Sequence, residues 1–183
     1  MPYNFADFKK KTASVVEWFQ KECSGIRTGR ATPSLLDGIL VESYGSKVPI
    51  NQVGSVTAED PKSLRITPWD MTVAKHVEKA ITLANLGLSV VLDEKGVRVI
   101  FPDLSAERRT ALIKIAKEKM EEARKTLRME RDKEWKLIET KEKEGGMGED
   151  EKFRLKKDME KIADDVHKKL EEMLAKKEAE IQG

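Results

Sequence analysis

Residues 112–148 read LIKIAKEKMEEARKTLRMERDKEWKLIETKEKEGGMG, and this stretch decides the fold. Its apolar residues recur in steps of three and four, which is the spacing of a helix that buries one face. The stripe consists of Leu112, Ala116, Met120, Ala123 and Leu127, and it resumes at Trp135 and Ile138. Four residues, 145–148, then interrupt the pattern with three glycines. We therefore expect one long helix from Leu104 to about Glu144, with Ser105 as its N-cap.

The same spacing occurs on both sides of this helix. Residues 149–181 carry an apolar stripe made of Leu155, Met159, Ile162, Val166, Leu170, Met173 and Ile181. Residues 4–28 carry another, made of Phe8, Val15, Phe19, Cys23 and Ile26. Two long helices joined by a short glycine turn must run antiparallel, and the first helix can pack against both. The pattern predicts a three-helix bundle.

The segment between the first two helices has a different character. Short β-rich runs separated by turn residues are expected at residues 38–42, 48–50, 55–57, 64–67, 89–92 and 97–101, with a short helix over 73–85. The sequence thus predicts an α+β chain with a small β/α domain, residues 31–103, inserted into a bundle made of residues 1–30 and 104–183.

Only two stretches of chain connect the predicted domains, which favours a hinge between them. Pro33 and Pro102 fix the backbone near these connections, although simple helix termination is an equally good explanation for both prolines. The expected hinge residues are Arg30, Ala31, Thr32, Pro33, Ser34, Pro102, Asp103 and Leu104.

Composition narrows the functional classes. Charged residues make up 37% of the 183 residues, yet the net charge is only +2, so any nucleic-acid surface must come from how the basic residues are arranged. The single cysteine, Cys23, allows no internal disulfide and favours a reducing compartment. With no signal or membrane-spanning pattern, we expect a soluble cytoplasmic protein; a mature organellar form stays open.

Residues 26–37, IRTGRATPSLLD, resemble the signature of ribosome recycling factors, and similarity continues in order along the chain at 41–45, 64–66, 77–81, 86–88, 97–99 and 104–109. The resemblance implies an L-shaped molecule of two arms. It also implies binding to the large ribosomal subunit after termination, followed by separation of the subunits with elongation factor G and GTP. In that scheme GTP hydrolysis belongs to the partner, and we expect a monomer without catalytic residues or cofactor.

Four basic residues on the long helix are the candidate RNA-binding residues. Lys117, Arg124, Arg128 and Arg131 fall within about 60° of one another at about 100° per residue, beside the apolar stripe. Such a row is more often only a solvated face with intrahelical ion pairs. The family resemblance favours RNA contact instead, because its Arg-x-x-Arg pair matches Arg128 and Arg131. The family commonly has a further arginine where this chain has Asp132, which makes the local charge uncertain.

Enzymatic function finds no support in the sequence. Neither His76 nor His167 belongs to a metal-binding spacing, and no nucleophile elbow or phosphate-binding loop is present. Cys23 lies on an apolar stripe, which indicates packing. The alternative to a ribosome-binding factor is an adaptor or chaperone-like protein that binds other proteins through its helices, and such a protein would not need the basic row.

Overall fold

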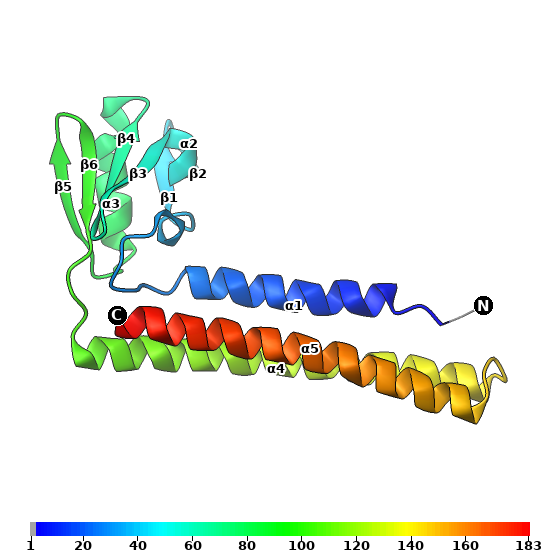
Figure 1. Ribbon diagram of the computed structural model, residues 1–183. Helices are drawn as coiled ribbons and strands as arrows, with labels where there is room; N and C mark the ends of the chain where they lie inside the picture. The colour runs from blue at the N-terminus through cyan, green and yellow to red at the C-terminus, as the bar shows by residue number, and fades with distance from the viewer. Residues whose placement is uncertain (1–2) are drawn as a thin grey trace. The chain divides into compact units, whose positions relative to one another are not determined.

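The computed structural model describes residues 3–183 and divides the chain into two compact units. The helical unit comprises the chain up to Cys23 together with Lys114–Lys177. The β/α unit comprises Ser24–Ile113 together with Glu178–Gly183. Three long helices packed as a bundle and an inserted β/α domain confirm the predicted α+β fold (Figure 1).

The helical unit is built from α1 (Ala6–Ser24), most of α4 (Ala106–Lys143) and most of α5 (Glu149–Gln182). The side chain of Asn4 caps the start of α1, accepting the amide of Ala6 at 2.9 Å. The predicted N-cap of α4 is confirmed, since Ser105 accepts the amide of Arg108 at 3.2 Å. Between α4 and α5 the chain turns at Gly145, whose φ of +77° favours glycine.

Two apolar clusters hold the three helices together. One contains Val15, Phe19, Cys23, Met120, Ala123, Leu127, Val166 and Leu170. The other contains Phe8, Ile138, Leu155, Met159 and Ala163. Every predicted stripe thus contributes to the bundle, and burying its large side chains stabilises the unit by about 1.5–3 kcal/mol each. The polar faces of the helices remain available for binding.

The β/α unit contains a four-stranded antiparallel sheet in the order β3-β4-β6-β5. These strands are β3 (Gly54–Asp60), β4 (Ser63–Pro68), β5 (Ser89–Asp93) and β6 (Gly96–Ile100). Helix α3 (Ala74–Leu83) packs against it, preceded by the 3-10 turn η2 (Met71–Val73). Leu64, Ile66, Val97 and Val99 point into a common core with Val77 and Ile81 of α3.

A separate hairpin of β1 (Leu40–Ser43) and β2 (Ser46–Pro49) joins the same core. The predicted second strand was wrong at its end, because Ile50 begins the one-turn helix α2 (Ile50–Val53). Pro49 precedes this turn, and Ile50 and Val53, three residues apart, are both buried. Another short turn, η1 (Pro33–Leu35), was also missed: Pro33 ends no helix here but occupies the first position of a new one.

Candidate RNA-binding surface

All four candidate RNA-binding residues lie on α4 outside its buried stripe. Lys117, Arg128 and Arg131 are exposed and Arg124 is half-buried. At about 1.5 Å per residue, Arg124 and Arg131 lie about 10 Å apart along the helix axis. This row, called the arginine row below, therefore has the spacing required to reach neighbouring phosphates of a nucleic-acid backbone.

Arg124 is held by two carboxylates. Its Nη1 donates to Glu121 on the same helix at 2.7 Å, and its Nη2 donates to Glu171 on α5 at 3.2 Å. The Nε of Arg124 is buried and has no partner within residues 3–183. His167 also contacts Glu171, with Nε2 3.1 Å from the same carboxylate oxygen. To bind a phosphate, Arg124 would have to exchange these carboxylates for it.

Arg128 and Arg131 differ in their partners. Arg131 donates to Asp132 through Nη2 at 2.9 Å and through Nε at 3.3 Å. Asp132 therefore neutralises much of the charge that Arg131 presents. The side chain of Arg128, in contrast, has no hydrogen-bond or ion-pair partner among the described residues. Arg128 is the guanidinium of the row that is ready to bind an external anion.

Trp135 lies near the arginine row but has a different role. Its ring lies 5.6 Å from the ammonium of Lys152 and 5.2 Å from that of Lys156, both on α5. It also packs against the cluster that contains Ile138. These cation–π contacts join the ends of α4 and α5, so Trp135 stabilises the bundle.

The predicted hinge residues before the sheet all belong to the β/α unit. The amide of Ala31 donates to the carbonyl of Pro61 at 2.8 Å, and that of Arg30 to the hydroxyl of Thr28 at 3.3 Å. Thr32 precedes η1, which contains Pro33 and Ser34. Local hydrogen bonds and turn geometry thus define this stretch.

The second group of predicted hinge residues lies in the same unit. Asp103 forms an ion pair with Lys62 at 2.7 Å, and Leu104 is buried. The carbonyl of Pro102 accepts a hydrogen bond from the guanidinium of Arg27. Residues 30–34 and residues 102–104 therefore both make specific contacts with the sheet or with the residues that precede it.

Arg27 is buried, and no pattern in the sequence indicates this. Its Nη1 donates to the carbonyl of Gly87 at 2.7 Å, while Nη2 donates to Pro102, and its guanidinium lies 6.0 Å from the centre of the Phe101 ring. Burial, followed by repulsion from Arg108, lowers the pKa of Arg27. Arg27 is a structural clamp between three segments of the β/α unit, in keeping with a structural rather than an RNA-binding role.

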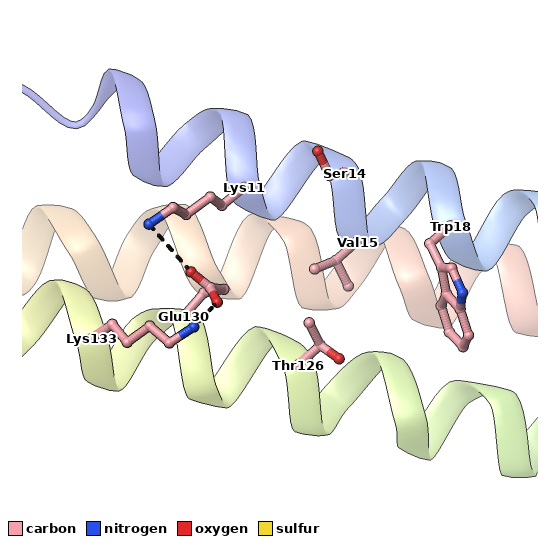
Figure 2. A pocket seen from close by; sticks show the side chains of 7 residues that line it. All are labelled: Lys11, Ser14, Val15, Trp18, Thr126, Glu130 and Lys133. Atoms are coloured by element: carbon pink, nitrogen blue, oxygen red, sulfur yellow. Dashed lines mark hydrogen bonds and ion pairs between the residues drawn. The ribbon is translucent and has the colours of Figure 1, made fainter.

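A cleft between α1 and α4 is a second polar feature of the helical unit, and sequence reasoning missed it (Figure 2). It has a volume of about 380 Å³ and is lined by Lys11, Ser14, Val15, Trp18, Thr126, Glu130 and Lys133. Lys133 donates to Glu130 at 2.5 Å, and Lys11 lies 3.6 Å from the same carboxylate. The lining residues face away from the arginine row, because Thr126, Glu130 and Lys133 fall about 100–180° from its residues at about 100° per residue.

Over residues 3–183, no group of three or more His, Cys, Asp or Glu side chains is arranged to hold a metal ion. No helix in the same range is both long and apolar enough to cross a lipid bilayer.

Comparison with known proteins gives a consistent family match. The model of the family described as ribosome recycling factor matches residues 19–181. A ribosome-recycling factor from Novosphingobium aromaticivorans is 40% identical over 181 residues, which cover 99% of this chain and 98% of the relative. One from Symbiobacterium thermophilum is 37% identical over 175 residues, with coverage of 96% and 95%.

Solved structures agree with the sequence matches. A solution structure of the ribosome recycling factor superposes with a TM-score of 0.77 at 33% identity, covering 100% of this chain and 99% of that one. A second structure describes the T. thermophilus ribosome recycling factor and the E. coli elongation factor G bound to the E. coli post-termination complex. Its matching chain has a TM-score of 0.69 at 35% identity, with coverage of 98% and 97%.

Proposed function

The chain belongs to the ribosome recycling factor family, and from this premise we propose which of its surfaces engage the ribosome. It is a cytoplasmic, non-enzymatic translation factor that acts with elongation factor G on the post-termination complex. The prediction of family and function made from residues 26–37 and the similarity along the chain is thereby confirmed. The finer steps, binding to the large subunit and its release from the small subunit with GTP, are part of the proposal.

The helical unit binds ribosomal RNA through the arginine row. The observation that carries this proposal is the unpartnered guanidinium of Arg128, exposed on α4 one turn from Arg131. A planar guanidinium can bind two phosphate oxygens at once, and recognition of folded RNA rests largely on such backbone contacts. Lys117 and Arg124 extend the row toward the N-terminus of α4, with Arg124 partly occupied by Glu121 and Glu171.

Arg128→Ala, Arg131→Ala and a control, Lys157→Ala, test this proposal by cosedimentation with 50S subunits at several salt concentrations. Lys157 is an exposed cation of α5 with no partner in the described part of the chain. We expect Arg128→Ala to weaken binding about tenfold and to lower the salt dependence by about one phosphate contact. Equal binding by Arg128→Ala and the native protein, at every salt concentration, would contradict the proposal.

A polysome-breakdown assay with elongation factor G and GTP tests the activity as a whole. The native protein should release ribosomes, and Arg128→Ala should need a higher concentration to reach the same rate. Because the assay reports the complete reaction, it also shows whether reduced binding limits recycling. No release by the native protein with a matched elongation factor G would count against the proposed subunit separation.

We also propose that residues 31–103 move as a domain relative to residues 1–30 and 104–183. Arg30 to Ser34 and Pro102 to Leu104 would then act as the hinge. Support for a movable domain comes from the division of the chain into two compact units, which the chain crosses only at 23/24, 113/114 and 177/178. Both hinge stretches lie on the β/α side of these crossings.

Spin labels at Lys125 of α4 and Glu94 of the β5–β6 turn, in a Cys23→Ala background, would measure this motion. Both labelled positions are exposed. We expect the distance distribution to shift when elongation factor G and ribosomes are added, and to broaden in Pro102→Gly, which frees the backbone. One narrow distribution, unchanged by partners and by Pro102→Gly, would refute the hinge.

A further inference from the structure

The cleft between α1 and α4 combines two helix faces. Ser14 and Val15 lie three and four residues after Lys11, and Trp18 lies four and three residues after them, a spacing that places side chains on one side of α1. Thr126, Glu130 and Lys133 follow the same spacing on α4. Figure 2 shows the two lysines directed toward Glu130 at one end of the cleft and Trp18 at the other end.

The charged end of the cleft carries an excess positive charge. Lys133 donates to the carboxylate of Glu130, and this hydrogen bond lowers the pKa of Glu130, so the carboxylate stays charged. One carboxylate balances only one of the two ammonium groups. Lys11 forms a longer ion pair with Glu130, at 3.6 Å, and its side chain is 53% exposed. An ammonium group has three N–H donors, so Lys11 can contact an external anion while it stays near Glu130.

The opposite end of the cleft is aromatic. Trp18 is half-buried, and Lys119, itself held 3.2 Å from Glu22, lies 5.7 Å from the centre of its ring. Trp18 also packs against the apolar cluster of the bundle, which restricts its movement. A restrained indole beside a cleft provides a stacking surface for a planar ring.

Two hydroxyl groups lie between the ends. Ser14 donates to the carbonyl of Lys10 and Thr126 to the carbonyl of Glu122, each at 3.1 Å. Because both hydroxyl protons are used within the helices, each oxygen offers lone pairs to a donor. A ribose 2′-hydroxyl is such a donor, and it distinguishes RNA from DNA.

We propose that the cleft binds one unpaired nucleotide of ribosomal RNA, with its phosphate at Lys11 and Lys133, its ribose at Ser14 and Thr126, and its base against Trp18. Lys11 and Trp18 lie seven residues apart, about 10 Å along α1, which one extended nucleotide can span. The volume of about 380 Å³ suits a single small ligand and excludes a helix. This inference rests on the proposed binding to ribosomal RNA and adds a second contact on a different face of α4.

Chemical probing of 50S ribosomal RNA, with and without the full-length protein, tests the proposal. The variants are Lys11→Ala and Trp18→Leu, which keeps apolar packing but removes the stacking ring; the matched control is Lys10→Ala, an exposed lysine of α1 outside the cleft. We expect the native protein and Lys10→Ala to protect one unpaired base that both cleft variants leave reactive. Trp18→Leu should weaken binding about tenfold, and Lys11→Ala should reduce the salt slope by about 0.7.

Three outcomes would refute the nucleotide site. If no unpaired base is protected, or if both cleft variants protect it like the native protein, the nucleotide site is refuted. Cross-linking of a photoreactive group at position 14 to a ribosomal protein instead of RNA would also overturn it. Lys11→Ala removes only an exposed side chain, so its result counts even if Trp18→Leu proves less stable.

Arg128→Ala, measured in parallel, separates this proposal from the arginine row. If Arg128→Ala binds weakly and both cleft variants bind and protect the base like the native protein, the nucleotide site in the cleft is refuted and the arginine row is supported. Native binding by Arg128→Ala with loss of base protection in the cleft variants would support the cleft and refute the row.

Discussion

Arg124 on α4 donates to Glu171 on α5 at 3.2 Å, so one member of the arginine row also links two helices of the bundle. The side chains of the pair are 33% and 52% exposed, which means that water screens their attraction. Glu121 contacts the same guanidinium at 2.7 Å. Arg124 therefore has a smaller share of its charge to offer to RNA than Arg128.

Arg124→Ala should consequently change stability little and RNA binding less than Arg128→Ala does. We expect the free energy of unfolding to fall by about 0.2–1 kcal/mol, as for other exposed ion pairs. A double-mutant cycle with Glu171→Ala, followed by urea unfolding, measures the coupling, and Glu172→Ala on the same helix is the control. A coupling energy well above this range would mean that the pair is a major structural contact. If Arg124→Ala bound RNA as weakly as Arg128→Ala, Arg124 would have an equal part in RNA contact.

Asp132→Asn should strengthen binding to 50S subunits. Asp132 accepts two hydrogen bonds from Arg131, so a phosphate must displace it, and its charge also repels the RNA. Removing the charge should tighten binding about fivefold, equal to roughly 1 kcal/mol, and make the salt dependence steeper. Cosedimentation over a salt series measures both quantities. Asp158→Asn, an exposed carboxylate of α5, is the control. Unchanged binding by Asp132→Asn would show that Arg131 makes no phosphate contact.

The bundle was predictable because its signal is periodic. Spacings of three and four over long segments locate a buried stripe, and Phe19, Met120 and Leu170 are indeed almost completely buried in one cluster. Which guanidinium is free is a different kind of property. Arg124, Arg128 and Arg131 share the same face, and they differ in their partners: Glu121 and Glu171 hold Arg124, and Asp132 holds Arg131.

Short elements and long-range contacts were not predictable, because neither produces a repeating pattern in the sequence. Helix α2 is a single turn, too short for any period to be recognised, and it follows a proline that also fits a strand edge. The clamp formed by Arg27 depends on segments 59–75 residues away in sequence. The cleft at Lys11 and Trp18 forms only when α1 and α4 pack in one register, and an apolar stripe does not reveal which residues of the two helices lie opposite each other.

Tyr3→Phe should destabilise the helical unit in a manner that depends on pH. The hydroxyl of Tyr3 donates to Glu134 at 2.9 Å, and Glu134 is only 6% exposed. Loss of the donor leaves a buried carboxylate without this partner, at a cost of about 1–2 kcal/mol. Urea unfolding at neutral pH measures the loss. The control is Tyr44→Phe in the other unit, which removes a hydrogen bond to Asp70 at a position that is 83% exposed.

The pH dependence follows from the phenol. Burial, together with donation to Glu134, raises the pKa of Tyr3 above its ordinary value of 10. The unfolded chain therefore loses this proton at lower pH than the folded one, and stability falls as the pH rises above about 10. We expect the native protein to lose more stability than Tyr3→Phe between pH 9 and pH 11. A constant difference between the two proteins over this range would contradict the assignment.

Arg27→Ala should strongly destabilise the β/α unit. The substitution leaves the carbonyls of Gly87 and Pro102 without the buried donor that joins them, which costs about 3 kcal/mol. Gly87→Ala tests the same clamp from its other side. Gly87 has a φ of +68°, and a Cβ there would lie 3.0 Å from Nη1 of Arg27. This variant should lose about 1–2 kcal/mol, because an L side chain is strained in that conformation.

Thermal unfolding and hydrogen exchange resolved by residue measure both effects, with Gly38→Ala as the control, since a Cβ at Gly38 meets no neighbouring atom. Protection should fall in segments 86–88 and 100–101 of Arg27→Ala, whereas the amides of α5 should keep theirs. Arg27 lies in residues 26–37, the stretch that resembles the family signature. A large loss of stability in Arg27→Ala would explain, without any RNA contact, why an arginine stands at this position. Native protection in Arg27→Ala combined with weaker 50S binding would instead place Arg27 among the RNA-binding residues.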